Sequence, residues 1–138
     1  MPKQRFNPPE LFPSLQYGFS QLVVSQGGRT VYVSGQVAWD ADENIVGPGD
    51  LRAQTWQSLR NLQTALQAAG GALSDVVSLR IYIAHNELAD TRAISEGLKE
   101  FFPAECAPTS TWIGVPGLAD PEFLIEIEAV AVIEEAGL

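Results

Sequence analysis

Two carboxylates near the end of the chain, Glu126 and Glu128, are the residues best placed to transfer protons. They stand two residues apart in an alternating apolar segment, so both project from one face of a predicted strand, about 7 Å apart. A partly buried glutamate can act as a general base, and we assign that role to Glu126. The alternative is that the carboxylates form ion pairs with a structural role. The predicted alternation allows Arg80 to lie on the same face of the sheet and pair with either carboxylate, and a basic residue of a neighbouring copy could do the same. We prefer this alternative for Glu128.

Other catalytic classes lack their essential residues. His85 is the only histidine and falls in a predicted loop, so nothing requires a Ser-His-Asp triad with Ser34. Cys106 is the only cysteine, which excludes an intrachain disulfide. One histidine and one cysteine also argue against a zinc site. We expect neither a metal nor a cofactor.

An alternation of strands and helices positions these residues. The proline-rich residues 1–14 are expected to form an irregular lead-in. Strands are predicted at 17–24, 30–34, 76–83, 111–115 and 123–133. The first two are expected to pair as a hairpin. One helix is predicted to begin at Asp50 and end at Gly70, with an apolar stripe at spacings of three and four, and a second to span 90–101. The order β-β-α-β-α-β-β predicts one α+β domain over residues 1–138, with both helices on one side of a sheet.

Two helices can cover only one face of such a sheet. The opposite face is predicted to hold the apolar residues Val76, Tyr82, Leu124, Val130 and Val132. Exposing such surface to water costs about 25 cal/mol per Å². We therefore expect copies of the chain to close around this face in a ring. Glu126 and Glu128 would then lie near a subunit boundary, where a ligand or a partner must satisfy them.

The charge of the chain limits its partners. The 138 residues include 17 acidic and 8 basic ones, for a net charge of −9. Nucleic-acid binding needs a basic surface that releases counterions, so we expect no nucleic-acid partner. No apolar run reaches the roughly 20 residues that span a bilayer, and the N-terminus is unlike a secretory signal. We expect a cytoplasmic protein with no membrane partner.

The segment from Ala107 to Ala131, APTSTWIGVPGLADPEFLIEIEAVA, resembles the C-terminal signature of the Rid family, the reactive intermediate deaminases also called YjgF-like or endoribonuclease L-PSP proteins. The similarity runs from about Gly18 to Val132. It includes Gly18-Phe19-Ser20-Gln21, Val33-Ser34-Gly35-Gln36, the stretch 63–70 and Glu126-Ile127-Glu128-Ala129. The resemblance implies a chorismate-mutase-like fold and a homotrimer with three small-molecule clefts between subunits.

The resemblance also implies which residues form the cleft. In members that hydrolyse imines, an arginine binds the substrate carboxylate through two parallel hydrogen bonds, and a glutamate orients the attacking water. Here Glu126 matches the glutamate, and Ser34 and Gly35 match a Ser-Gly pair that supplies polar contacts.

Two positions depart from this pattern. Phe19 stands where a tyrosine is usual, and Tyr17, on the same predicted strand face, is a candidate to supply the missing hydroxyl. Thr109 stands where the arginine is usual, and losing a charge-assisted bidentate contact weakens ligand binding by several kcal/mol. Thr109 and Ser110 are expected to line the cleft, although turn chemistry alone would explain both hydroxyls. We therefore do not expect the usual reaction with free 2-imino acids.

Two functions stay open. In the first, the trimer hydrolyses or tautomerises a small enamine, imine or carbonyl metabolite, with Glu126 as the proton-transfer group. In the second, the trimer and cleft persist as a non-catalytic ligand-binding or regulatory module. An endoribonuclease is the weakest alternative, because the acidic charge opposes RNA capture and the sequence has no pair of histidines for acid–base catalysis.

Overall fold

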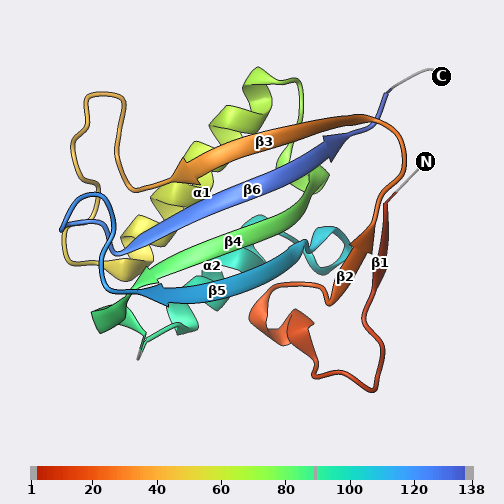
Figure 1. Ribbon diagram of the computed structural model, residues 1–138, viewed down its shortest axis with the longest axis horizontal. Helices are drawn as coiled ribbons and strands as arrows, with labels where there is room; N and C mark the ends of the chain where they lie inside the picture. The colour runs from red at the N-terminus through yellow and green to blue at the C-terminus, as the bar shows by residue number, and fades with distance from the viewer. Residues whose placement is uncertain (1–2, 89, 136–138) are drawn as a thin grey trace.

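The protein is a mixed β-sheet with two helices packed on one face. The computed structural model describes residues 3–88 and 90–135. Its strands are β1 (Gln4–Phe6), β2 (Leu22–Val24), β3 (Arg29–Gln36), β4 (Val76–Ala84), β5 (Thr109–Val115) and β6 (Ile125–Ile133), and its helices are α1 (Leu51–Ala68) and α2 (Arg92–Phe101). The main sheet has the order β3-β6-β4-β5, with β4 and β5 parallel and the other neighbours antiparallel. Both helices lie behind this sheet and leave its other face uncovered (Figure 1). The predicted α+β fold class is confirmed.

Local sequence signals account for α1. The Asp50 side chain accepts a hydrogen bond from the Ala53 amide at 3.0 Å and so caps the helix start. The leucines of the predicted stripe, Leu59, Leu62 and Leu66, are completely buried. Gly70 follows the helix with a φ of 81°, a left-handed conformation that favours glycine and ends the helix.

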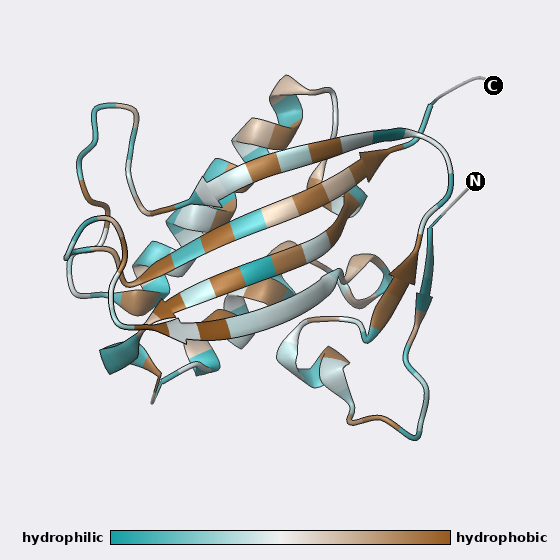
Figure 2. Ribbon diagram, in the orientation of Figure 1, coloured by the Kyte–Doolittle hydropathy of each residue, from teal (hydrophilic) through white to brown (hydrophobic). Residues whose placement is uncertain are grey.

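The alternation along β6 places the acids as predicted. Ile125, Ile127 and Ala129 are buried against the helices, whereas Glu126 and Glu128 are half-buried on the uncovered face. Figure 2 shows apolar and polar residues alternating along the strands of the main sheet. The period of two therefore decides which side chains are available for chemistry.

The N-terminal part differs from the prediction. The expected hairpin is wrong, because β2 pairs with β1 in a separate two-stranded sheet rather than with β3. The lead-in expected to be irregular thus contains a strand. A 3-10 helix at Ser14–Tyr17 and a left-handed Gly18 replace the start of the expected strand. A Cβ at Gly18 would lie 2.6 Å from the Cβ of Leu98, so the chain here packs closely on α2 and turns away from β3.

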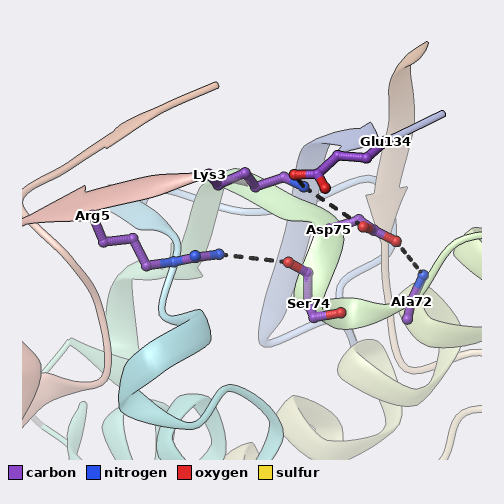
Figure 3. Close-up of polar contacts among 6 residues, drawn as sticks. All are labelled: Lys3, Arg5, Ala72, Ser74, Asp75 and Glu134. Carbon is purple, nitrogen blue, oxygen red and sulfur yellow. Dashed lines mark hydrogen bonds and ion pairs between the residues drawn. The ribbon is translucent and has the colours of Figure 1, made fainter. Parts of the chain in front are cut away.

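Polar contacts of Lys3 and Arg5 join β1 and the residue before it to the end of the main sheet (Figure 3). The Lys3 Nζ atom lies 3.6 Å from a carboxylate oxygen of both Asp75 and Glu134, and the lysine side chain is only 6% exposed. The Arg5 Nε atom donates to the Ala107 oxygen at 3.2 Å. These contacts join the N-terminal strand to the segments that precede β4 and β5 and to the one that follows β6.

Three of the apolar residues predicted on the uncovered face are buried within one protomer. Val76 is completely buried in the core, because a bulge shifts the β4–β6 register between Val76 and Ser78 and reverses the alternation. Leu124 precedes β6 and packs into the same core. Val132 is 6% exposed, and a methyl of its side chain lies against Gly28 in the turn before β3.

The uncovered face nevertheless keeps some apolar surface. Tyr82 and Val130 are half-buried there, as predicted. Tyr32, which pairs with Val130 across β3 and β6, is 79% exposed. The assembly of copies through this face stays a prediction.

Candidate functional site

A bulge in β3 brings Gly35 against Glu126. The register of β3 on β6 shifts between Val33 and Gln36, so one extra residue is accommodated at Ser34 and Gly35. A Cβ at Gly35 would lie 2.7 Å from Glu126 Cδ and would overlap the Oε2 atom. Only glycine leaves room for this carboxylate. The structure thus brings together two of the predicted site residues.

A cavity of about 650 Å³ opens beside this pair. Its lining residues are Gly35, Gln36, Val37, Trp39, Asp40, Ala41, Asn61, Thr64, Ala65, Ala119, Phe123 and Glu126. The volume suits a small molecule. Trp39 and Phe123 meet edge to face, with ring centroids 4.9 Å apart, and form an aromatic wall. Ser34 does not line this cavity, and its backbone oxygen accepts a hydrogen bond from the Gln36 side chain at 3.0 Å.

The charged residues on the cavity wall are both acids. A hydrogen bond from the backbone amide of Asn44 is the main cause that holds the pKa of Asp40 below its ordinary value of 3.8, and the Asp42 amide adds to it. Asp40 is therefore ionised at neutral pH, and no lysine or arginine lines the cavity beside it. This wall favours a neutral or cationic group over a free carboxylate.

The other predicted site residues lie at the opposite edge of the sheet. Thr109 and Ser110 begin β5, which is one edge strand, whereas Gly35 lies in β3, the other edge strand. With β6 and β4 between them, the two edges are about 14 Å apart. None of the predicted residues Tyr17, Phe19, Thr109 and Ser110 lines the cavity at Glu126.

The residues at this second edge are engaged with one another. The Thr109 hydroxyl donates to the Val77 oxygen at 3.0 Å. The Trp112 indole donates to the Ser110 hydroxyl at 2.9 Å. The Phe19 ring packs against Trp112, with centroids 6.2 Å apart. The hydroxyl proton of Thr109 is thus used in a hydrogen bond to the backbone, and the Phe19 ring packs against the Trp112 ring.

The prediction that Tyr17 and Phe19 share a strand face is wrong. Tyr17 ends a 3-10 helix, and the left-handed Gly18 turns the chain before Phe19. The Phe12 ring contacts both, with centroids 6.4 Å from Tyr17 and 6.1 Å from Phe19. Tyr17 is also 44% exposed on the side that faces α2.

Glu128 has a structural contact. The Tyr82 hydroxyl donates to a carboxylate oxygen of Glu128, and this hydrogen bond, followed by burial, raises the pKa of Tyr82. Arg80 lies opposite Glu128 in the β4–β6 register. Among the described residues, however, no ion pair joins Arg80 to Glu128 or Glu126 within one protomer, and pairing to a base of a neighbouring copy stays a prediction.

Sequence reasoning missed several residues of the cavity wall. Asn61 donates through Nδ2 to the oxygens of Val37 and Trp39, both at 2.9 Å, and so fixes the segment that carries the indole. Gln57 donates to the Asn61 side chain at 2.9 Å. The sequence signal for these residues is the pair of polar side chains Gln57 and Asn61, which stand four residues apart beside the apolar stripe of the helix.

Two classes of feature are not found in the described part of the chain. No group of three or more His, Cys, Asp or Glu side chains there is arranged to hold a metal ion. None of the described helices is long and apolar enough to cross a membrane.

Comparison with known proteins identifies the family. The family model described as endoribonuclease L-PSP matches residues 12–133. The chain belongs to this family. The names Rid and YjgF are also used for this family. The chain is similar to a 2-iminobutanoate/2-iminopropanoate deaminase of Dermatophagoides farinae, with 36% identity over 116 residues that cover 84% of this chain and 86% of that protein.

Solved structures of the Rid family share the fold. YyfB of Yersinia pestis, a Rid-family protein of unknown function, is 43% identical with a TM-score of 0.89, over 96% of this chain and 100% of that one. TdcF of E. coli, crystallised with bound serine, is 32% identical with a TM-score of 0.68, over 80% of this chain and 85% of that one. The identities and coverage support a Rid-like role toward a small metabolite.

Proposed function

We propose that this Rid-family chain forms a homotrimer whose intersubunit clefts hydrolyse or tautomerise a small imine, enamine or carbonyl metabolite. Glu126 is the proton-transfer group. The observation that carries the proposal is the half-buried Glu126 carboxylate, seated against Gly35 on the wall of a cavity of about 650 Å³.

The separation of the predicted site residues supports assembly from two copies. Ser34, Gly35 and Glu126 lie toward the β3 edge, whereas Thr109 and Ser110 lie on β5 at the opposite edge. One protomer cannot present both groups to one small ligand across about 14 Å. A neighbouring copy supplies the second group in the proposed cleft, with Phe19 and Tyr17 beside it.

The proposed hydrolysis needs one proton acceptor. Glu126 takes a proton from water while the water oxygen bonds to the imine carbon, and passes this proton to the imine nitrogen. Glu126 then carries the remaining hydroxyl proton to the same nitrogen as the C–N bond breaks, so a carbonyl forms and ammonia leaves. Glu126 returns to its ionised form at the end of the cycle.

The cavity wall favours substrates without a free carboxylate. Asp40 and Glu126 are the charged lining residues, and both are acids. Thr109 offers no guanidinium for a carboxylate, and its hydroxyl already donates to Val77. Neutral or cationic imines are therefore better substrates than 2-imino acids in the proposed reaction.

The test compares two kinds of substrate and two variants. Purified protein is assayed on enzymatically generated 2-aminoacrylate and on neutral enamines, with faster turnover expected on the neutral compounds. Glu126→Gln should abolish this turnover, whereas the matched control Glu122→Gln, an exposed residue just before β6, should not. Absence of acceleration on every compound, or an unimpaired Glu126→Gln variant, contradicts the proposal.

A second candidate is a binding module on the same trimer. It is favoured by the Thr109 hydroxyl, whose donation to the Val77 oxygen leaves it without a free proton for catalysis. Thermal-shift measurements with keto acids, short fatty acids and nucleotides separate the two functions. Strong stabilisation without turnover of any imine or enamine supports binding alone.

A further inference from the structure

A second cavity, of about 590 Å³, lies on the helix side of the sheet. It is lined by Gln16 and Tyr17 of the 3-10 helix, by Thr91, Arg92, Ser95, Glu96 and Lys99 of the α2 region, and by Trp112 of β5. It shares no lining residue with the cavity at Glu126. Its volume lies in the range of small-molecule sites.

The charged residues of this cavity come from one face of α2. Arg92, Ser95, Glu96 and Lys99 follow the spacing i, i+3, i+4 and i+7, which places them in a row. The two cations lie two turns apart, about 10 Å along the helix axis. Both are exposed, and neither forms an ion pair with any residue of the described chain.

The one acid in this row is already neutralised. Both carboxylate oxygens of Glu96 accept from the Arg52 guanidinium, at 2.7 and 2.8 Å. The cavity therefore has a positive balance in a protein whose net charge is −9. Arg92 and Lys99 are therefore available to bind an anionic ligand.

Two hydroxyls line the cavity beside the cations. Ser95 is 8% exposed, lines the cavity, and makes no side-chain hydrogen bond within residues 3–88 and 90–135. Thr91, at the start of α2, likewise makes no capping hydrogen bond with its side chain. Both hydroxyls are therefore available from the cavity to donate a hydrogen bond to a ligand.

The walls of the cavity are held in place. Gly18 contacts Leu98 so closely that any Cβ there would collide, which fixes the 3-10 helix against α2. Ser20 donates through its hydroxyl to the Ala107 oxygen at 2.7 Å and through its amide to the Pro108 oxygen at 2.8 Å. These contacts hold the backbone around Gly18 against α2 and the segment before β5, next to the Tyr17 and Trp112 rings that line the cavity.

We infer that this cavity is a binding site for a small organic anion with a planar or aromatic body. The carboxylate or phosphate of such a ligand accepts hydrogen bonds from Arg92, Lys99 and the Ser95 hydroxyl. Its body lies against Trp112 and Tyr17. The inference shares Tyr17 with the residues placed beside the proposed cleft, but it does not depend on the reaction proposed for Glu126.

The test follows the Trp112 indole by NMR. Protein with ¹⁵N-labelled tryptophan is titrated with benzoate, and Trp112→Phe assigns the signal. Benzoate at millimolar concentration should shift the Trp112 signal saturably and leave the Trp39 signal in place. Benzamide, which has the same ring but no charge, should bind at least about tenfold more weakly.

Variants separate the anion site from general effects. The double variant Arg92→Gln/Lys99→Gln should weaken benzoate binding at least about tenfold, whereas Arg60→Gln, an exposed cation on α1, should not change it. Glu126→Gln should also leave it unchanged, so this result does not depend on the proposed reaction. The absence of a saturable shift, equal binding of benzamide, or unchanged benzoate binding by the double variant overturns the inference.

Discussion

Gly35 and Glu126 occupy adjoining space across β3 and β6, and the carboxylate fills the position that a side chain at Gly35 would need. The β3 bulge produces this contact, because it turns the backbone at Ser34 and Gly35 out of the regular ladder. The position of the proposed proton-transfer group therefore depends on a glycine in the neighbouring strand.

Replacing Gly35 by alanine should displace the Glu126 carboxylate. Turnover of a responsive enamine should fall at least about tenfold, since small misplacements of a catalytic group are costly. Gly117→Ala is the matched control, because a Cβ there meets no atom within 4 Å. Steady-state kinetics and circular dichroism distinguish displacement from unfolding. A folded Gly35→Ala variant with unchanged turnover would count against the role of Glu126.

Gln54 should contribute strongly to stability. It is completely buried, its Nε2 donates to the oxygens of Glu122 and Gly47 at 3.0 and 3.2 Å, and its Oε1 accepts from the Leu124 amide at 2.9 Å. Gln54→Leu leaves the buried Leu124 amide without a partner and removes the two bonds to the part-buried oxygens, so the free energy of unfolding should fall by about 1–3 kcal/mol. Urea unfolding measures this loss. Gln67→Leu, exposed on the same helix, should change stability by no more than about 0.5 kcal/mol.

The ionisation of Tyr82 should be visible at high pH. The hydrogen bond to Glu128 raises the pKa of Tyr82 above its ordinary value of 10.0, and burial adds to the effect. Because the folded state holds the proton more tightly than the unfolded state, stability should decline as pH rises from the ordinary value through the raised one. An absorbance titration should show a late tyrosinate step that Tyr82→Phe removes and Glu128→Gln shifts to lower pH. A step unmoved by Glu128→Gln would contradict the assigned cause.

The Lys3 ion pairs should stabilise the N-terminal strand. The lysine side chain is 6% exposed, and its partners Asp75 and Glu134 are 21% and 40% exposed. Because these partners are partly solvated, Lys3→Met should lower the free energy of unfolding by about 1–3 kcal/mol. Hydrogen exchange should also accelerate in β1 and β2. Arg60→Gln serves as a surface control, and equal effects of the two substitutions would show that the Lys3 contacts contribute little.

Local periodicity made the helices and β6 predictable from sequence. Asp50, Gly70 and the leucine stripe define α1 through contacts only a few residues apart. The partner of β2 was not predictable in this way, because the choice between β1 and β3 depends on how Gly18 packs on α2. The bulge beside Val76 could not be predicted from the sequence either, because Val76 and Val77 are both valines and either side chain could point into the core.

The sequence predicted only the part of the candidate site that lies on a single strand. Glu126 follows from the alternation of β6, whereas Trp39 and Asn61 reach the same cavity from separate segments of the chain. The distance between Gly35 and Thr109 depends on the strand order, which places β6 and β4 between them. Strand order is a tertiary property that no local pattern specifies.

The central claim is that the reactive cleft is completed by a second copy, because its proposed residues lie on opposite edges of one sheet. Sedimentation of the purified protein at micromolar concentration tests this claim most directly. The account predicts a single species with three times the protomer mass. A stable, monodisperse protomer under these conditions would contradict it.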